Sequence, residues 1–335
     1  MIKLKLRLDD ATNTPKHEQI AYGIIKCIEN KELRKGDILP SLKKMSDDLG
    51  VSCATVAKAY DTLKKRGIIE SVPYKGYHIA RESVSHDIRI FLLFDQLNMF
   101  KEGLYNAFKA QLAEKAMVDI FFHHYNPGVF ESLISDNIGR FSHYIIMPFY
   151  HRSVNKVINE IDPEKLLILD QPGFLNEGLP GICQDFEGDV QRCLMCGLPR
   201  IRKYQRLNLF YPEPNIHPKA VTMGFKRFCI DNGIPHTVYG KLEPELIQPN
   251  QAYIVISDAA LVQAIKTCQA NQYEVGRDVG IISYNDTPLN EIIAGGVTTI
   301  STDFARMGRR AAEMVLSSER IREINIASLI IRNSL

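Results

Sequence analysis

The stretch LPSLKKMSDDLGVSCATVAKAYDTLKKRGII, residues 39–69, decides the fold of the first part of the chain. Ser41 has the side chain of a helix N-cap, which predicts a helix that begins after Ser41. Gly50 suits the end of that helix. A second helix is expected to begin near Ser52 and to end at Gly67. A helical winding of 100° per residue places four apolar residues on one buried face: Val56, Ala59, Tyr60 and Leu63. The amino end of this helix carries small residues, where a surface helix usually carries long charged ones.

The surrounding segments complete a small domain. Isoleucines recur at helical spacing between Thr14-Pro15 and Asn30, which predicts an amphipathic helix capped by Thr14. After Gly67, two short β-prone runs flank the sequence YKG and predict a hairpin. Three helices followed by a hairpin form a winged helix-turn-helix. We place this domain at residues 1–80 and a polar linker at 81–87.

The small residues at the helix end predict a close approach to another molecule. An α-helix fits the major groove of B-DNA, and its amino-terminal residues then lie nearest to the base edges. Methyl groups there can touch thymine, and hydroxyls and backbone N–H groups at the positive helix end suit a phosphate. The predicted DNA contacts are Lys43, Ser52, Ala54, Thr55, Lys58, Lys75 and Gly76. The alternative is a helical subdomain that uses this end for internal packing.

The distribution of charge agrees with a polyanion as the partner of the first domain. The chain of 335 residues has a net charge of +2, but residues 1–83 hold 16 Lys and Arg against 11 Asp and Glu. The remainder holds 25 against 28, so the excess of positive charge belongs to the small domain. Chance unevenness is the alternative. No signal-peptide or membrane-length apolar run is present, and seven scattered cysteines favour a reducing compartment, so we expect a cytoplasmic protein.

From Ile88 the pattern changes to apolar runs that alternate with helical stretches. The runs are 88–94, 118–124, 143–149, 166–170, 206–211, 252–257 and 280–284. Continuous apolar strands joined by helices predict an α/β fold with doubly wound parallel sheets. The number of runs favours a bilobed domain at 88–335. Ligands of such sheets bind beyond the carboxyl ends of the strands, which here lie between the two lobes.

Polar residues follow several of these runs. They are Asp95 with Gln96, Asp170, Ser257 with Asp258, and Asn285. Carboxylates and amides beside an aromatic ring are the groups that bind a sugar. For Asp258, a role at the start of a helix is the better interpretation.

The segment 39–79 resembles the DNA-binding domain of GntR-type regulators, whose pattern is roughly LPSER-L-A-LGVSR-TV-A-L-L-GL followed by a wing with GKG. The resemblance covers nearly all of residues 15–80 and adds Cys53 to the DNA-contacting set. Arginine is frequent in the family where this chain has Lys43 and Cys53, and Ala57 replaces a residue that is often basic. Because arginine reads guanine bidentately, we expect weaker guanine readout and more dependence on apolar contacts and DNA shape.

The segment DVGIISYNDTPLNEIIAGGVTTISTDFARMGRRAAEMVL, residues 278–316, resembles the periplasmic-binding-like domain of LacI/GalR-type regulators. Carried over to this chain, the resemblance implies that nine residues face an effector: Asp95, Phe100, Met147, Asp170, Leu242, Ser257, Asn285, Thr302 and Phe304. We rank Asp95, Asp170, Asn285 and Phe304 highest. Together the two resemblances suggest a hybrid regulator of the arabinose-repressor type, possibly one that responds to fucose or a pentose.

This chain departs from the LacI pattern in the ligand site. Val221 stands where the family commonly has an arginine, and Leu242 and Met147 stand where it has aromatic residues. Lys219 is near the arginine position. We therefore expect a small neutral sugar, a pentose or deoxyhexose, rather than a purine or a sugar acid.

Other motifs indicate no further chemistry. The CLMC sequence at 193–196 lies in a helical stretch without other ligands, and His123 and His124 are adjacent at a strand end, where we expect a surface or hinge role. No phosphate loop or GxSxG motif is present. We therefore expect no enzyme, cofactor or metal. The prediction is a homodimeric repressor of double-stranded operator DNA that a sugar controls. Two alternatives remain open: a sugar-binding protein whose first domain contacts protein, and a sugar-converting enzyme.

Overall fold

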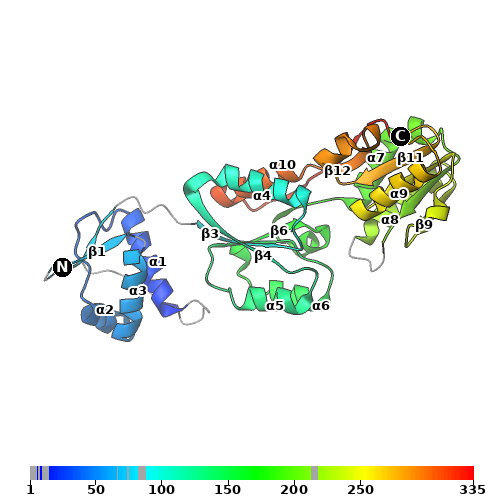
Figure 1. Ribbon diagram of the computed structural model, residues 1–335. Coiled ribbons are helices and arrows are strands. Elements are labelled where there is room, and N and C mark those ends of the chain that lie inside the picture. The colour runs from blue at the N-terminus through cyan, green and yellow to red at the C-terminus, as the bar shows by residue number, and fades with distance from the viewer. Residues whose placement is uncertain are drawn as a thin grey trace.

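The computed structural model describes residues 6, 8, 9, 15–65, 67–73, 75–81, 88–212 and 218–335, and in this part of the chain a small domain precedes two α/β lobes (Figure 1). The elements of the small domain are α1 (Lys16–Glu29), α2 (Leu42–Leu49), α3 (Cys53–Lys65), β1 (Ile69–Val72) and β2 (Gly76–Ile79). Ser41 caps α2 by accepting a hydrogen bond from the N–H of Lys44 at 3.2 Å, and Gly50 ends it with φ 64°. Both expectations for this helix are confirmed. The expected cap of α1, Thr14, lies outside the described residues.

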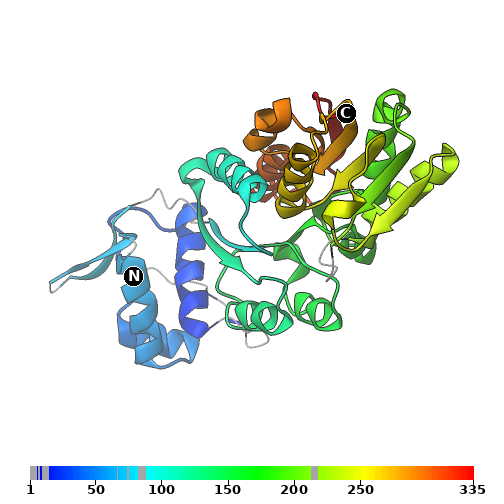
Figure 2. The ribbon, with the colours of Figure 1, turned by 45° about the vertical axis from the view of Figure 1, so that its right-hand side comes forward.

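The core of the small domain fixes the angle between α2 and α3. The predicted face of α3 is fully buried, and Tyr60 on this face donates a hydrogen bond to the carbonyl of Pro40 at 2.9 Å. The Tyr60 ring also packs edge-on against Tyr77 of β2 at 4.8 Å between centroids, which ties the hairpin to the helix. Figure 2 shows the β1–β2 hairpin standing out from the three helices. The arrangement is a winged helix-turn-helix.

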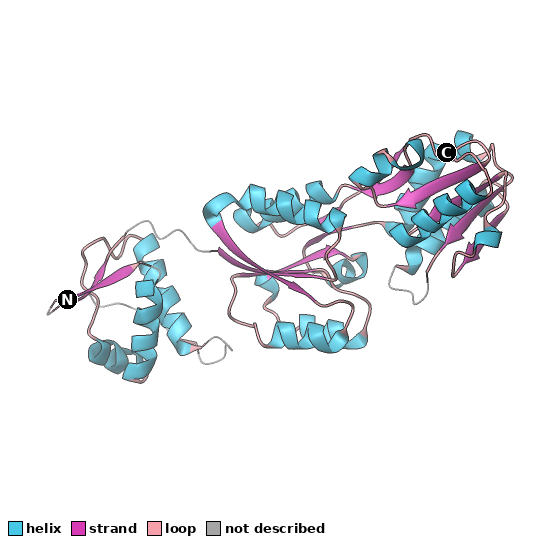
Figure 3. Cartoon of the chain, in the orientation of Figure 1, coloured by secondary structure: helices cyan, strands magenta, loops and turns pink. Residues whose placement is uncertain are grey.

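Lobe 1 is a sheet covered by helices on both faces (Figure 3). Its strand order is β13-β7-β6-β5-β3-β4. The strands are β3 (Ile88–Phe94), β4 (Ala116–Phe122), β5 (His143–Ile146), β6 (Leu166–Asp170), β7 (Gly181–Cys183) and β13 (Arg322–Ile324). The helices α4 (Met99–Leu112) and α10 (Phe304–Ser317) cover one face, and α5 (Pro127–Ser135) and α6 (Arg152–Ile158) cover the other. Gly308 lets α10 approach α4 closely, because a Cβ atom there would lie 2.2 Å from the carbonyl of Leu104.

Lobe 2 repeats this plan with the strand order β14-β12-β11-β10-β8-β9. Its strands are β8 (Arg206–Phe210), β9 (His236–Tyr239), β10 (Gln251–Val255), β11 (Val279–Tyr284), β12 (Thr298–Thr302) and β14 (Ala327–Ile330). The helices α7 (Phe186–Ile201) and α8 (Lys219–Asp231) cover one face, and α9 (Asp258–Ala270) covers the other. The expected α/β class with two doubly wound sheets is confirmed, with one correction: β14 pairs antiparallel with β12.

In the described residues, the chain crosses between the lobes three times. The crossings follow β7, β12 and β13, at Gln184, Asp303 and Asn325. Lobe 1 therefore depends on α10 and β13, which come from near the end of the chain, and neither lobe is a continuous segment. Residues 82–87 of the expected linker lie outside the described residues, so the domain boundaries remain predictions.

Several strand predictions needed correction. The strand expected at 118–124 is β4 at Ala116–Phe122, and the strand expected at 143–149 ends at Ile146. The short strands β7, β9, β12, β13 and β14 were absent from the list of apolar runs. Each has three to five residues, too few to show a pattern without the neighbouring strand.

Candidate nucleic-acid interface and ligand site

The amino end of α3 is open to solvent. Ser52, Cys53 and Ala54 are exposed, and Thr55 is half-buried. Ser52 caps the helix: its Oγ accepts a hydrogen bond from the N–H of Thr55 at 3.1 Å and lies 2.8 Å from the Thr55 hydroxyl. The helix end is therefore not packed into the interior of the domain, which contradicts the internal-packing alternative.

The other predicted DNA contacts lie on α2, on α3 and in the hairpin. Lys43 in the first turn of α2, Lys58 on α3 and Lys75 before β2 are all exposed. Gly76 has φ 89°, and a Cβ atom there would meet no heavy atom within 4 Å. An exposed lysine beside a bare glycine backbone is suited to a sugar-phosphate chain. Their roles in DNA binding stay predictions.

The carboxyl ends of the strands carry two residues with a left-handed backbone. Asp170 ends β6 with φ 73°, and Asn285 follows β11 with φ 66°. These strands hold the same place in the two sheets, third from the edge formed by β13 and by β14, respectively. Such backbone strain costs about 1–3 kcal/mol and gathers at functional sites. The structure thus marks corresponding positions at the lobe junction, and both were among the highest-ranked effector candidates.

Asp95 forms a buried ion pair. Its Oδ1 accepts from Nζ of Lys101, its Oδ2 accepts from the Tyr125 hydroxyl at 2.6 Å, and its side chain also accepts from the N–H of Gln96. Burial by itself would raise the pKa of Asp95, but the charge of Lys101 and these hydrogen bonds outweigh burial and lower the pKa. Asp95 is therefore an ionised carboxylate whose two oxygens already have partners.

The pKa of Asp170 is shifted in the opposite direction, upward. Its carboxylate is buried, and burial raises its pKa despite the nearby charge of Lys101 and a hydrogen bond from Gln184. The negative charge of Asp95 raises the pKa of Asp170 further, because a nearby like charge disfavours the ionised form. The same Gln184 side chain accepts a hydrogen bond from the Thr302 hydroxyl at 2.5 Å. Two of the predicted effector residues, one from each lobe, are thus joined through a glutamine that the sequence had not singled out.

Three buried polar atoms near these residues lack a hydrogen-bond partner. They are Oε1 of Gln171, Oδ1 of Asn285 and the hydroxyl of Tyr284. Burial raises the pKa of Tyr284, and the carboxylates of Asp189 and Asp170 raise it further, so this hydroxyl stays protonated. A buried polar atom without a partner costs about 1–3 kcal/mol. Two acceptors and one donor among the described residues are thus left unsatisfied by the protein.

The remaining effector candidates differ in how accessible they are. Phe304 stacks on Phe100 at 4.8 Å between ring centroids, and the pair packs against the core of lobe 1. Ser257 caps α9 by accepting from the N–H of Ala260 at 3.2 Å, and Leu242 packs in the second core of lobe 2. Met147 is only 1% exposed, so it supports the site from the core and presents no surface to a ligand in this conformation.

The position that carries arginine in the LacI pattern is apolar here. Val221 is 2% exposed in the core of lobe 2, while Lys219 at the start of α8 is exposed. The neighbouring Thr222 has a buried hydroxyl without a partner. In the described structure, position 221 therefore offers a ligand no positive charge in place of the family's arginine.

Sequence reasoning missed Lys101, Tyr125, Gln171, Gln184 and Tyr284. Tyr125 reaches Asp95 through a turn in which His124 and Tyr125 have φ 47° and 57°. The expectation for the HHY sequence was a surface or hinge role; the surface role is wrong for His123, and the hinge role stays a prediction. This histidine is fully buried, with Nε2 2.9 Å from the carbonyl of Met147. A non-glycine left-handed turn has no sequence signature, so only the fold reveals this contact.

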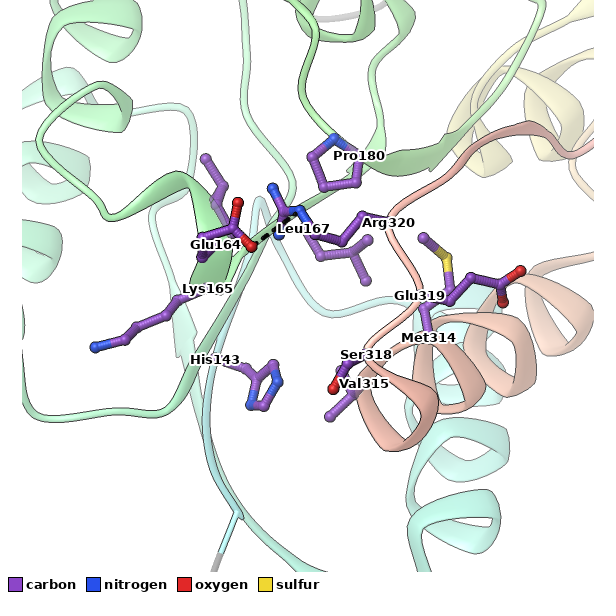
Figure 4. Close-up of a pocket in the computed structure, with 11 residues that line it drawn as sticks. His143, Glu164, Lys165, Leu167, Pro180, Met314, Val315, Ser318, Glu319 and Arg320 are labelled. Carbon is purple, nitrogen blue, oxygen red and sulfur yellow. Dashed lines mark ion pairs between the residues drawn. The ribbon is translucent and has the colours of Figure 1, made fainter. Parts of the chain in front are cut away.

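A cavity of about 200 Å³ lies elsewhere, at the amino ends of β5 and β6 (Figure 4). Its walls include His143, Lys165, Leu167, Met314, Val315 and Arg320. None of the predicted effector residues lines it. Among the described residues, no cluster of three or more His, Cys, Asp or Glu side chains is arranged to hold a metal ion. Over the same residues, no helix is long and apolar enough to span a bilayer.

Two family models match parts of the chain. Residues 16–79 match the bacterial regulatory proteins of the gntR family, and residues 202–335 match the periplasmic binding protein-like domain. The Escherichia coli mannosyl-D-glycerate transport/metabolism system repressor MngR is 35% identical over 82 residues, 24% of this chain and 34% of that protein. The Streptococcus thermophilus regulator GalR is 26% identical over 178 residues, 45% of this chain and 52% of its own length. The chain thus spans about a third to a half of these two relatives.

Solved structures agree on the fold of the larger domain. The trehalose repressor of Escherichia coli has a TM-score of 0.62 at 15% identity and covers 73% of this chain and all of its own. The lactose repressor bound to the anti-inducer ONPF has a TM-score of 0.62 at 18% identity, over 73% of this chain and 99% of its own. At these identities the likeness establishes the fold.

The protein therefore joins a winged helix that matches the gntR family to a bilobed domain that has the fold of the lactose and trehalose repressors and whose second part matches the periplasmic binding protein-like domain. The relatives named above are transcriptional regulators, as is the Bacillus subtilis repressor YtrA, which is 29% identical over 99 residues, 30% of this chain and 72% of that protein.

Proposed function

We propose that the protein is a cytoplasmic transcriptional repressor that binds operator DNA as a homodimer and responds to a small neutral sugar held between its lobes. The observation that carries the proposal is the exposed, slim amino end of α3 in a GntR-type winged helix. A helix whose first turn carries only Ser52, Cys53 and Ala54 at its tip can bring its backbone close to base edges.

The DNA contacts fall into two kinds. Ala54 touches base edges through its methyl group, and Cys53 takes a place where arginine would read guanine. Ser52 and Thr55 contact a phosphate at the positive end of α3, and Lys43 and Lys58 neutralise flanking phosphates. Lys75 and Gly76 place the wing against the sugar-phosphate chain. Specificity then depends on apolar contacts and DNA shape more than on guanine readout.

The polar groups at the lobe junction favour a polyol as the effector. Oε1 of Gln171 and Oδ1 of Asn285 are acceptors without partners, and Asp170, which precedes Gln171, supplies a third acceptor. Sugar hydroxyls donate to such oxygens, while the carboxylate of a sugar acid would meet Asp170 without an arginine to neutralise it. The printed names of MngR and of the trehalose and lactose repressors associate these relatives with carbohydrates.

The apolar substitutions favour a pentose or a deoxyhexose. Val221 is buried, and Leu242 and Met147 replace aromatic residues of the LacI pattern. These side chains are packed in the cores of the lobes and offer no polar partner to a further hydroxyl, which suits an effector with a methyl group or without a hydroxymethyl group. An effector of the fucose or arabinose type fits this composition.

The dimer contact is proposed at the free edges of the two sheets. Strand β4 is the edge of lobe 1 and β9 the edge of lobe 2, and exposed apolar side chains lie nearby: Met117 on β4, and Met223 and Ile230 on α8. A solved relative is described as a dimeric lac repressor. A symmetric pair would set the spacing of two half-sites, which a ligand changes only through unequal affinity for two lobe arrangements.

The decisive experiment measures DNA binding against salt. A duplex selected from a random library is titrated with the protein at 50–300 mM salt, followed by fluorescence anisotropy. Phosphate contacts from Lys43, Lys58 and Lys75 in each of two subunits predict a log–log slope near −5. A flat salt dependence, or no binding to any duplex, would refute the DNA-binding role and leave a sugar-binding protein whose first domain contacts protein.

The sugar is identified by thermal shift against a monosaccharide panel, since a ligand that binds the folded state raises the melting temperature. Asn285→Ala is expected to abolish the shift and the sugar-dependent release of DNA while preserving DNA binding. Loss of both activities together would assign Asn285 a structural role instead.

A further inference from the structure

Gln184 lies where the chain first leaves lobe 1 for lobe 2. It directly follows β7 and precedes Asp185, the N-cap of α7. The residue is 3% exposed, and both ends of its amide are engaged. Nε2 donates to Oδ1 of Asp170, and Oε1 accepts from the hydroxyl of Thr302 at 2.5 Å. A buried amide that is bonded at both ends cannot move without disturbing one of its partners.

The two partners belong to different lobes. Asp170 ends β6 in lobe 1, whereas Thr302 ends β12 in lobe 2 and precedes Asp303, the N-cap of α10, where the chain returns to lobe 1. They are 132 positions apart in the printed sequence, and Gln184 bridges the lobes between them. The contact therefore joins a candidate ligand group to the second crossing.

The third crossing is bonded to the other two. The N–H of Asn325 donates to the carbonyl of Cys183 at 2.8 Å, and Nδ2 of Asn325 donates to the carbonyl of Asp303 at 2.9 Å. The crossing segments thus form one hydrogen-bonded group. Any change in the angle between the lobes must act on this group, because the crossings are the covalent connections of the lobes in the described chain.

We infer that Gln184 is the positioning residue that couples the occupancy of Asp170 to the angle between the lobes. A sugar hydroxyl that donates to the Asp170 carboxylate competes with the amide of Gln184 for the same group. The amide can shift only together with the Thr302 hydroxyl, so the change at Asp170 reaches the second crossing. This role rests on the proposed function, since it deepens the regulation of the same site.

The coupling is tested without ligand or DNA by hydrogen exchange of the full chain, measured by mass spectrometry. Asp170→Ala removes the group that Gln184 holds. We expect it to speed exchange at Thr302 to Phe304 about tenfold, the change that about 1.4 kcal/mol produces. In a Gln184→Met background, which keeps the side-chain length but loses both hydrogen bonds, Asp170→Ala should have no further effect there.

Controls separate coupling from general loosening. Gln191→Met alters a glutamine of α7, the helix that follows Gln184. Nε2 of Gln191 lies 3.5 Å from Oε1 of Glu187, and no hydrogen bond joins it to Asp170 or Thr302 among the described residues. In this background the effect of Asp170→Ala should persist. Exchange in β3 and β8 should be unchanged throughout, and Thr302→Val gives a second way to break the link if Gln184→Met fails to fold. An equal effect of Asp170→Ala with and without Gln184, or no effect in either case, overturns the inference.

A second arm distinguishes failure of this role from failure of the proposed function. L-fucose and L-arabinose are added to the protein–duplex complex. If the wild type binds no duplex, or neither sugar changes its affinity, the proposed function fails, while the exchange experiment still decides the role of Gln184. If a sugar makes the wild type release DNA, the Gln184→Met variant should bind that sugar with a Kd within about threefold of the wild-type value but lose most of the sugar-dependent release. Undiminished release overturns the inference.

Discussion

The ion pair between Asp95 and Lys101 predicts a large loss of stability when one partner is neutralised. The side chains are 10% and 5% exposed, respectively, so neither charge is solvated by water. Asp95→Asn removes the charge and keeps the side-chain shape: its single oxygen can still accept from the N–H of Gln96, and its NH2 group can donate to the hydroxyl of Tyr125. Leaving a buried ammonium without its counter-charge costs about 3–5 kcal/mol. For a domain of this size, each kcal/mol lowers the melting temperature by about 2–4 °C, so we expect a fall of roughly 6–20 °C.

The measurement is calorimetry or circular dichroism of the full chain, with two further variants. Asp119→Asn is the matched control, because its carboxylate pairs with Arg89 at 3.0 Å but is 40% exposed. An exposed pair contributes about 0–1 kcal/mol, so its melting temperature should change by only a few degrees. Asp95→Asn combined with Lys101→Met should regain most of the loss, since neutral groups replace both charges. A shift below about 2 °C for Asp95→Asn, or a double variant as unstable as the sum of both single variants, would refute the reasoning.

The pH dependence gives an independent check on Asp95. The fold lowers the pKa of this carboxyl, so its contribution to stability is present above the unfolded pKa of about 3.9 and is lost as pH falls through the folded pKa. The difference in melting temperature between wild type and Asp95→Asn should therefore shrink below about pH 4. A difference that stays constant down to pH 2 would show that charge is not its source.

Three further predictions address DNA binding and the lobe junction. Ala54→Leu places a larger side chain on the exposed end of α3, so the free energy of unfolding should change by less than about 0.5 kcal/mol. Fluorescence anisotropy should show at least about tenfold weaker DNA binding, because the larger side chain keeps the helix from the base edges. Unchanged binding would place this helix end outside the groove. Lys75→Ala removes one phosphate contact from each of two subunits, so it should weaken binding to all duplexes alike and reduce the salt slope by about 2, whereas a loss confined to one sequence would contradict a phosphate contact. Asp170→Asn should raise the melting temperature at pH 7, because burial raises the pKa of this carboxyl and its charged form opposes folding. This advantage should vanish below the unfolded pKa of about 3.9, and a fall in melting temperature at pH 7 would contradict it.

Much of the fold could be predicted because local patterns carry it. The helical spacing of Val56, Ala59, Tyr60 and Leu63 places these four residues on the buried face that the structure shows. The run 88–94 coincides with β3, and the run 166–170 coincides with β6. These two strands are apolar on both faces, so their signature survives without knowledge of their neighbours, whereas β12, also buried but rich in threonine, has no such signature.

The sequence by itself determined a winged helix-turn-helix, two parallel-sheet lobes and the polar residues at their strand ends, because all three follow from periodicity and chain order. The tertiary structure decided which of these residues meet. It pairs Asp95 with Lys101 and Tyr125, and it joins Asp170 to Thr302 through Gln184. Asp95 and Lys101 are only six positions apart, and their contact depends on how the chain turns from β3 into α4. The other contacts depend on strand register and on the return of the chain across the lobes, and such distant pairings leave no trace in local composition.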